Sequence, residues 1–351
     1  MTSPRLSLVS LALLATVIAA ACGDSGETST VATQAPTAAT VTGSTAPAAT
    51  SQGTDATTAS GAVDITNAVF TERDADCAAY DSALVSDVSD ISRAMMFAGN
   101  VVITAEDAAC TLTSNNIPNH DFNDDSARFA NAVAEVQQTF SIPRDPQLAA
   151  SSTALSQRLY NAVMLNGVPV DLLSAGCYRP SDQMADADGN VAIGCSENDS
   201  WLLDPLGTES KFGADEHNAH TQPDGSYHYH GNPNALFDDS PGPEGSPVIG
   251  FAADGFPIYG SYFVDADNGE LRKAVSGYTL RAGDRPSSDT DPGGAYDGLY
   301  VDDWEFTGSG DLDECNGMTI DGQYGYYVTD SYPWIIACHS GTPDTSFAKG
   351  R

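Results

Sequence analysis

Short hydrophobic runs separated by turn-forming residues make up most of the chain after residue 62. Examples are NVVITA (100–105), AVMLNGVPV (162–170), SPVIGFAADGFPIYG (246–260) and LYVDDWEF (299–306). Gly, Pro, Asn and Asp interrupt these runs every few residues, which is typical of strands joined by tight turns. We therefore predict a mainly β fold, an antiparallel sandwich or distorted barrel with few helices and long loops.

One segment has the hydrophobic period of a helix instead. Residues 124–139 (DDSARFANAVAEVQQT) place Phe129, Val133 and Val136 at spacings of four and three residues. Acidic residues stand at the start of the segment, where they complement the positive end of a helix dipole. This pattern predicts an amphipathic helix over 124–139.

The first 21 residues have the pattern of an export signal. Arg5 supplies a positive charge, and the apolar stretch from Leu6 to Ala21 is too short for a comfortable membrane span. It ends in small residues before Cys22, which resembles the bacterial lipobox, so we expect residues 1–21 to be a lipoprotein signal peptide. Lipidation of Cys22 would anchor the exported protein to the outer face of the cell envelope. Ordinary cleavage, which leaves a secreted protein with a free thiol, is the alternative.

The chain then divides by composition into a tether and a folded part. Residues 22–62 consist mainly of Thr, Ala, Ser, Gly and Pro, and they lack the large apolar side chains whose burial would offset the entropy of ordering. We predict a disordered tether over 22–62. Residues 63–351 are long enough to bury a substantial core and are expected to form one β domain.

The remaining cysteines are even in number, as expected of an exported chain with disulfides. Six cysteines allow 15 connectivities. We expect the sequential pairs because each closes a modest loop: Cys77–Cys110, Cys177–Cys195 and Cys315–Cys338. Thiolates are then not available as nucleophiles or metal ligands.

Acidic residues outnumber basic ones by 48 to 14, which gives a formal net charge of −34. A surface of this charge repels phosphate backbones, so nucleic acid is excluded as a partner. We expect the membrane to be contacted only through the lipid on Cys22. Cations are attracted, although a strongly acidic surface is by itself usually only a solvated one.

Four of the chain's six histidines fall within HNAHTQPDGSYHYHG, residues 217–231. Pro223-Asp224-Gly225 fits the three-residue loop of a β-hairpin, with Pro and Asp in a type I turn and Gly in the left-handed position. This loop places His220 opposite His228 and Asn218 opposite His230. Since side chains alternate along a strand, the three imidazoles share one face, about 5–7 Å apart.

A two-residue loop of Asp224-Gly225 is the alternative. It would oppose His220 to Tyr229 and turn His220 to the other face, because a slip of one residue exchanges the faces. The cluster would then shrink to the pair His228 and His230.

Three imidazoles on one face predict a site for a divalent transition metal, copper or zinc. The structural alternative is a set of half-exposed strand histidines with local hydrogen bonds. Adjacent imidazolium ions repel each other, so the cluster needs neutral rings or a shared cation. We expect His217, which is one residue off this face, to be solvent-exposed beside Asp215 and Glu216, and His339, next to Cys338, to be incidental.

The motifs around the hairpin resemble those of the YHYH family of secreted bacterial proteins. They are SNNIPNH (114–120), LNGVP (165–169), NAHTQPDGSYHYHG (218–231), IGFAADGFPIYG (249–260), DDWEF (302–306), LDECNG (312–317) and YVTDSYPW (327–334). The resemblance implies an architecture and a site without a particular reaction. It adds His120 as a motif histidine that would complete four imidazoles around one ion if the fold brings it to the others.

Asp254, in AADGFPIYG, has two readings. It is either fixed in a turn by backbone amides, or it receives the second N–H of a liganding histidine or acts as a general base. Asn218 is a second candidate neighbour of the ligands. LDECNG offers further carboxylates beside a cysteine but lacks EF-hand spacing.

The sequence therefore favours an envelope-anchored protein that captures or delivers copper or zinc through His220, His228 and His230. One alternative is a metal-dependent hydrolase or oxidase that uses the same histidines with Asp254 as base. No HExxH motif, nucleophile elbow or Ser-His-Asp arrangement indicates a particular reaction. The other alternative is a module that binds a surface glycan or protein through aromatic residues around 324–334, with structural histidines.

Overall fold

The computed structural model describes residues 61–208 and 212–350 of the chain. The predicted signal peptide, Cys22 and the tether up to residue 60 lie outside the described residues. Among the residues described, no helix combines the length and apolarity needed to span a membrane.

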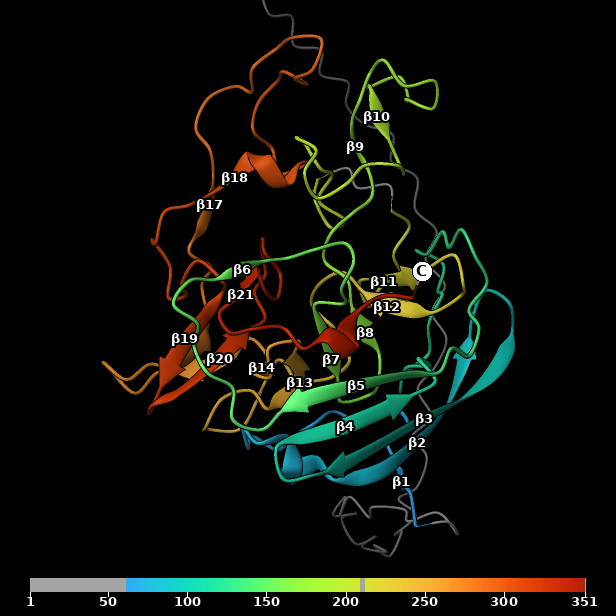
Figure 1. Cartoon of the computed structure of the whole chain (residues 1–351), viewed down its shortest axis with the longest axis vertical. Helices are drawn as coiled ribbons and strands as arrows, with labels where there is room; N and C mark the ends of the chain where they lie inside the picture. The colour runs from blue at the N-terminus through green and yellow to red at the C-terminus, as the bar shows by residue number, and fades with distance from the viewer. Residues whose placement is uncertain (1–60, 209–211, 351) are drawn as a thin grey trace, which may run out of the picture. The chain divides into compact units, whose positions relative to one another are not determined.

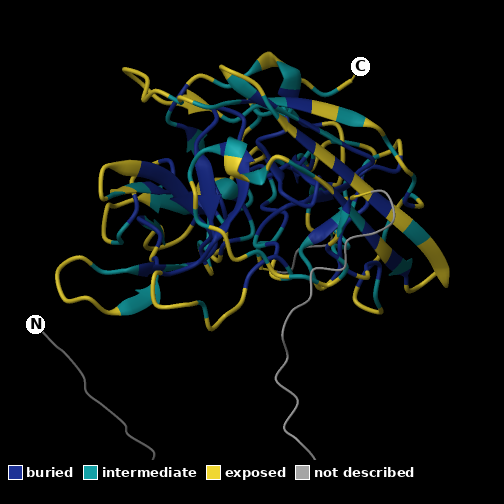
Figure 2. Cartoon of the chain, turned by 90° about the horizontal axis from the view of Figure 1, so that it is seen from below, coloured by how far each residue is buried: buried dark blue, intermediate teal, exposed yellow. Residues whose placement is uncertain are grey.

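A five-stranded sheet is formed by the N-terminal strands in the order β1-β2-β3-β4-β5 (Figure 1). The strands are β1 (Val63–Asp64), β2 (Ser82–Asp90), β3 (Met95–Ala105), β4 (Ala109–Ser114) and β5 (Gln138–Pro143). Burial alternates along them because one face is packed and the other solvated, as the alternating colours of the long strands show (Figure 2). Val101 and Ile103 point inward, for example, while Val102 and Thr104 are exposed.

The second large sheet has eight strands in the order β11-β12-β8-β7-β13-β14-β20-β19. The bounds are β7 (Ala162–Met164), β8 (Pro169–Val170), β11 (Ala219–Thr221), β12 (Tyr227–Tyr229), β13 (Val248–Ala252), β14 (Pro257–Tyr259), β19 (Gly317–Ile320) and β20 (Gln323–Tyr327). Several of these strands are buried on both faces, which explains their continuous hydrophobic runs. One core cluster joins the two large sheets, with Ile103 and Phe140 from the first and Phe251 from the second.

Four two-stranded sheets complete the fold. They pair β6 (Thr153–Ala154) with β21 (Cys338–His339), β9 (Cys177–Tyr178) with β10 (Asn190–Val191), β15 (Tyr262–Val264) with β16 (Leu271–Lys273), and β17 (Tyr278–Leu280) with β18 (Trp304–Phe306). The helical content of the described residues is three short 3₁₀ turns, η1 (Cys77–Tyr80), η2 (Val301–Asp303) and η3 (Thr345–Phe347).

The prediction of a mainly β fold with long loops is confirmed. Most strand pairs are antiparallel, but β1–β2, β8–β12 and β14–β20 are parallel. The eight-stranded sheet is open, with β11 and β19 at its edges, so the sheets form layers and not a closed barrel.

The predicted helix over 124–139 is wrong. The backbone of this segment bonds to distant parts of the chain: Arg128 N–H donates to Gly213, Ala134 N–H to Gly225, and Val136 N–H to Asn115. Phe129 and Val133 pack in the same core cluster without a helix, and Phe129 contacts the Tyr227 ring with 6.2 Å between centroids. Tertiary packing has therefore overridden a helical period, and the last two residues of the segment begin β5.

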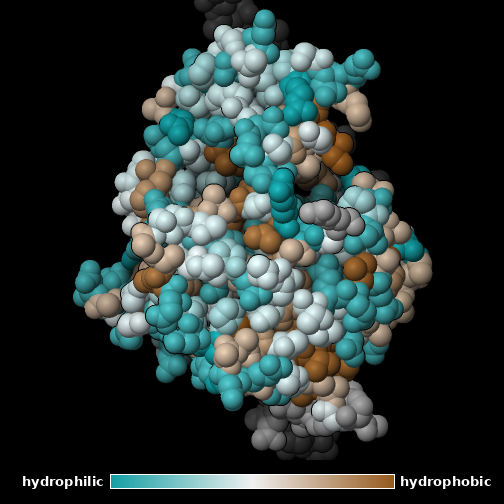
Figure 3. Space-filling model, in the orientation of Figure 1, coloured by the Kyte–Doolittle hydropathy of each residue, from teal (hydrophilic) through white to brown (hydrophobic). Residues whose placement is uncertain are grey.

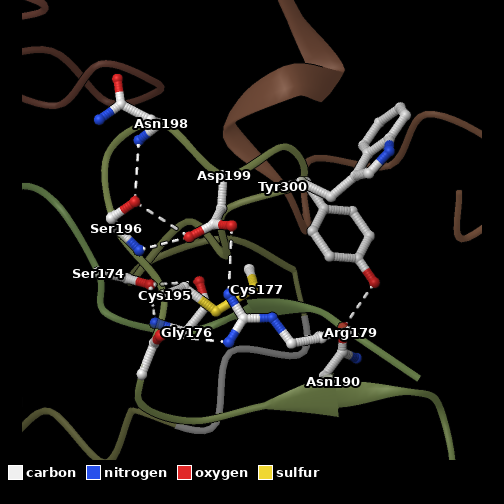
Figure 4. The surroundings of a disulfide bond; sticks show 12 residues. Ser174, Gly176, Cys177, Arg179, Asn190, Cys195, Ser196, Asn198, Asp199 and Tyr300 are labelled. Carbon is white, nitrogen blue, oxygen red and sulfur yellow. Dashed lines mark hydrogen bonds and ion pairs between the residues drawn. A yellow bond between two sulfur atoms is a disulfide. The ribbon is translucent and has the colours of Figure 1, made fainter. Parts of the chain in front are cut away.

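All three predicted disulfides form: Cys77–Cys110, Cys177–Cys195 and Cys315–Cys338. The Cys177–Cys195 disulfide lies in a small region of the fold. The core of this region has only four buried side chains, which are the two cysteines, Val191 and Leu202. Around it, Arg179 forms a 3.2 Å ion pair with Asp199, and Tyr300 donates a 2.7 Å hydrogen bond to Asn190 (Figure 4). The disulfide and these polar contacts replace the hydrophobic packing that this small region lacks.

The surface agrees with the acidic composition. The face in Figure 3 is mostly hydrophilic, and its apolar patches are small and separated. Such a surface gives no sign of a large apolar contact area on this face.

Candidate metal centre

The hairpin β11–β12 has the register expected from its turn. Ala219 pairs with Tyr229, His220 with His228, and Thr221 with Tyr227. The loop is Pro223-Asp224-Gly225, closed by a 2.9 Å bond from Gly225 N–H to the Gln222 carbonyl. Gly225 has φ +88°, the left-handed conformation that favours glycine. The three-residue loop is therefore correct, and the two-residue alternative is wrong.

The histidine triad, defined here as His220, His228 and His230, lies on one face of this hairpin. Nε2 of His230 is 3.0 Å from Nε2 of His228 and 2.9 Å from Nε2 of His220. The ring centroids are 4.6–4.8 Å apart, and the rings meet edge to face. The three potential ligand atoms thus converge on one point.

Backbone carbonyls fix the orientation of two of the rings. Nδ1 of His220 lies 2.9 Å from the Phe212 carbonyl, and Nδ1 of His228 lies 3.4 Å from the Ser226 carbonyl. A carbonyl only accepts, so these Nδ1 atoms carry the proton and the Nε2 atoms present lone pairs. Nδ1 of His230 has no hydrogen-bond partner.

Burial keeps the triad neutral. His228 and His230 are 1% and 3% exposed, and His220 is half-buried. Burial, with the neighbouring imidazoles, holds the pKa values of His228 and His230 well below the usual range. Burial also lowers the pKa of His220. The hydrogen bond to the Phe212 carbonyl and the charge of Asp171 act in the opposite direction and raise it. Neutral imidazole is the form that binds a metal.

The Nε2 lone pairs of His220 and His228 both point at Nε2 of His230, so they are satisfied either by a proton on that nitrogen or by a shared cation. Two nitrogens that each bind zinc at about 2.0–2.1 Å in tetrahedral geometry are roughly 3.3 Å apart. The observed separations of 2.9–3.0 Å are close to that spacing. The donor set therefore fits zinc or copper and leaves a fourth position for water or another ligand.

Asp171 is a member of this site that the sequence reasoning missed. It is 3% exposed, and its Oδ2 accepts hydrogen bonds from Gln222 (2.7 Å) and Lys349. Its Oδ1 is buried without a partner. A sequence signal existed, because Asp171 directly follows the buried run AVMLNGVPV, where an acidic residue is unusual.

His120 does not join the triad. Its Nε2 lies 2.7 Å from the Tyr229 hydroxyl and its Nδ1 lies 2.8 Å from the Asp121 carbonyl. Tyr229 alternates with His228 and His230 along β12, so His120 lies at the opposite face of the hairpin. The structure therefore separates the fourth candidate imidazole from the other three.

His217 is not the exposed side chain that the sequence suggested. Its ring packs against that of His120 in a tilted arrangement with 3.8 Å between centroids, and its Nδ1 lies 2.8 Å from Oδ1 of Asn234. The turn at Asn218, with φ +61°, directs His217 toward His120 and away from the triad. His339 is buried, and its Nε2 bonds the Asn161 carbonyl at 3.0 Å, which is a structural contact.

Neither predicted neighbour of the ligands contacts a triad side chain. Asn218 accepts the His230 backbone N–H through its carbonyl, while its side chain donates to the Asn232 carbonyl. Asp254 accepts from the Tyr326 hydroxyl at 2.6 Å and from the Gly341 N–H at 2.9 Å. These contacts agree with the prediction that Asp254 is held in a turn by backbone amides.

A second group of potential ligands, Asp76 with Cys77 and Cys110, is spatially close. Its two sulfur atoms are joined in a disulfide, and Asp76 is paired with Arg144 at 2.6 Å. These three residues therefore have a structural role, because their sulfur atoms and carboxylate are already bonded to other groups.

A family model described as YHYH protein matches residues 139–341. The matched range includes the histidine triad and Asp171, whereas His120 and Lys349 lie outside it. No curated protein and no solved structure matches the chain.

Proposed function

The chain belongs to the YHYH protein family, and from this membership and the geometry of the triad we propose that it is an extracytoplasmic protein that binds copper or zinc. His220, His228 and His230 hold the ion through Nε2. The role is capture or delivery of the ion at the cell envelope, to which the lipid on Cys22 anchors the protein.

The observation that carries this proposal is the convergence of the three Nε2 atoms, since those of His220 and His228 both lie within 3.0 Å of that of His230. A structural role would direct each ring toward its own donor or acceptor, as His120 and His339 do. In the triad, backbone carbonyls take the Nδ1 protons of His220 and His228, and the lone pairs are left for a shared cation.

The donor set also limits the ion. Imidazole nitrogens suit zinc, copper and nickel, whereas calcium and magnesium need oxygen ligands that the triad does not supply. The six cysteines of the described residues are paired, so thiolate ligation is excluded there. The disulfides also agree with an oxidising compartment outside the cytoplasm.

The two alternatives have less support. The hydrolase or oxidase is predicted with Asp254 as its base, and Asp254 is held by Tyr326 and Gly341 away from the triad. A glycan-binding platform would need exposed rings, but Tyr324, Tyr326 and Tyr327 are buried in the core.

The test is metal content by mass spectrometry on residues 63–351, purified without a histidine tag and incubated with Zn²⁺ or Cu²⁺. We expect about one ion per chain, lost in His228→Ala/His230→Ala. His217→Ala is the matched control, since it removes an imidazole of the same hairpin region that bonds Asn234 and not the triad.

Circular dichroism checks that each variant is folded. If the double variant unfolds, His220→Asn serves in its place, because His220 is only half-buried. Equal metal content in the wild type and the triad variants, or no metal in the wild type, would overturn the proposal.

A further inference from the structure

Strand pairing places an acidic side chain on the same face of the sheet as the triad. Tyr229 of β12 is registered with Val170 of β8, and Asp171 N–H donates to the Tyr229 carbonyl at 2.9 Å. Paired residues share a face and successive residues alternate, so Asp171 points to the face of His228 and His230. Adjacent strands are about 4.8 Å apart, which makes Asp171 a direct neighbour of the triad.

Two residues hold one oxygen of this carboxylate. Gln222 follows β11 on the His220 side of the hairpin and donates to Oδ2 at 2.7 Å, and the Lys349 ammonium bonds the same oxygen. Oδ1 is left as a buried acceptor without a donor. A buried carboxylate oxygen of this kind costs free energy unless a cation or a donor satisfies it.

Lys349 is held beside the site by the backbone around it. Its N–H donates to the Arg158 carbonyl at 2.9 Å, and Leu159 pairs with Ala348 in a β-bridge. Its ammonium also lies 5.3 Å from the centre of the Tyr160 ring. The chain has only three lysines, and this one is partly buried where it pairs with the buried carboxylate of Asp171.

The two charges act on the triad with opposite signs. An ion held among the three rings would place positive charge on this face of the sheet. The Asp171 carboxylate beside it attracts that charge, and the Lys349 ammonium, paired with the same carboxylate, repels it.

We propose that Asp171 and Lys349 set the metal affinity of the triad, with the carboxylate favouring a divalent cation and the ammonium competing with it. This inference rests on the proposed metal-binding function. Asp171 is a positioning residue, since its oxygens are not among the atoms that converge with the three Nε2 atoms. Its unpartnered Oδ1 is the atom through which the carboxylate would act on an ion held by the triad.

The experiment measures the Kd for Zn²⁺ by competition with a chromogenic chelator on metal-stripped protein. Asp171→Asn keeps the shape of the side chain and removes the charge, so we expect about 10–100-fold weaker binding. Lys349→Gln keeps a donor for Oδ2 and removes the competing charge, so we expect binding at least about fivefold tighter.

Two variants serve as controls. Lys349→Arg keeps the positive charge and should leave the Kd within about twofold of the wild type. Lys273→Gln breaks another lysine–aspartate pair, with Asp330 at 3.0 Å, that does not contact the triad, and it should also leave the Kd unchanged. Thermal unfolding of the metal-free variants separates a folding defect from a binding effect.

The outcomes separate this inference from the proposed function. If the wild type binds Zn²⁺ but Asp171→Asn and Lys349→Gln bind as tightly as the wild type, the charge pair has no role and the metal site stands. The inference also fails if both variants shift the Kd in one direction, as a general loss of packing would. A wild type that does not bind Zn²⁺ overturns both proposals.

Discussion

Tyr229 and His120, 109 residues apart, form a 2.7 Å hydrogen bond on the face of the hairpin opposite the triad. The Asp121 carbonyl accepts the Nδ1 proton of His120, so Nε2 is an acceptor and the tyrosine hydroxyl is its donor. Asn166 in turn donates to the same hydroxyl at 3.0 Å. One short strand thus carries metal-ligand candidates on one face and a buried polar network on the other.

The first prediction concerns acid sensitivity. Burial, with the nearby His217, lowers the pKa of His120 to about 3, whereas an unfolded histidine has a pKa of about 6.5. Between these values the unfolded chain binds a proton that the folded protein does not, so stability falls as the pH falls. One such group contributes about 1.4 kcal/mol per pH unit.

We expect His120→Gln to remove this contribution while it keeps an acceptor for Tyr229. The measurement is the free energy of unfolding in urea from pH 7 to 4, in the wild type and the variant. The buried triad contributes to both curves, so the difference between them isolates His120. Parallel curves would show that His120 is not a buried neutral group.

The second prediction uses the same variant for the metal. Both ring nitrogens of His120 are occupied by hydrogen bonds, one to the Asp121 carbonyl and one to the Tyr229 hydroxyl. The His120→Gln variant should therefore bind Zn²⁺ with the same stoichiometry and with a Kd within about threefold of the wild type. Isothermal titration calorimetry is the measurement. A loss of binding as large as that of the triad variants would place His120 among the ligands.

The hairpin could be predicted from sequence because its information is local. Pro223 and Gly225 select the turn, the turn fixes the register, and the register gathers His220 with His228 and His230. The position of His120 could not be predicted in this way, since it depends on how β12 packs against a distant loop.

Two other errors have the same origin. The helical period of 124–139 is real, but its backbone donors find partners at Gly213, Gly225 and Asn115 instead of four residues back. Asp171 was missed because its relation to the triad arises from a parallel pairing of β8 with β12, which periodicity does not reveal.

The third prediction concerns the Cys177–Cys195 disulfide. It closes a separation of 18 residues around a core of four side chains. Cross-linking a loop of this size stabilises the fold by about 3 kcal/mol in the chain-entropy model. We expect Cys177→Ala/Cys195→Ala to become susceptible to limited proteolysis between residues 177 and 202 while it still binds Zn²⁺.

Mass spectrometry of the fragments locates the cleavage, and the Zn²⁺ stoichiometry is measured on the uncleaved protein. Resistance equal to that of the wild type would show that the polar contacts of Arg179 and Tyr300 are sufficient to hold this region.

The last prediction links the turn to the metal site. Gly225 has φ +88°, and a Cβ there would lie 2.8 Å from the Ala132 carbonyl oxygen and 2.8 Å from the Ala134 Cβ. Gly283 has φ +90° with no atom within 4 Å of an added Cβ, so it is a matched control for backbone strain alone. We expect Gly283→Ala to cost about 1–2 kcal/mol of stability and to leave the Zn²⁺ affinity unchanged.

Gly225→Ala should cost about 1–3 kcal/mol more than that control, because the added methyl group forces the turn away from residues 132–134. The displacement moves His220 relative to His228 and His230, so the Zn²⁺ affinity should fall by about tenfold or more. Urea unfolding and chelator competition on the two variants give both quantities. If Gly225→Ala lost stability but kept the wild-type Kd, the triad would be positioned by the rest of the sheet and not by its turn.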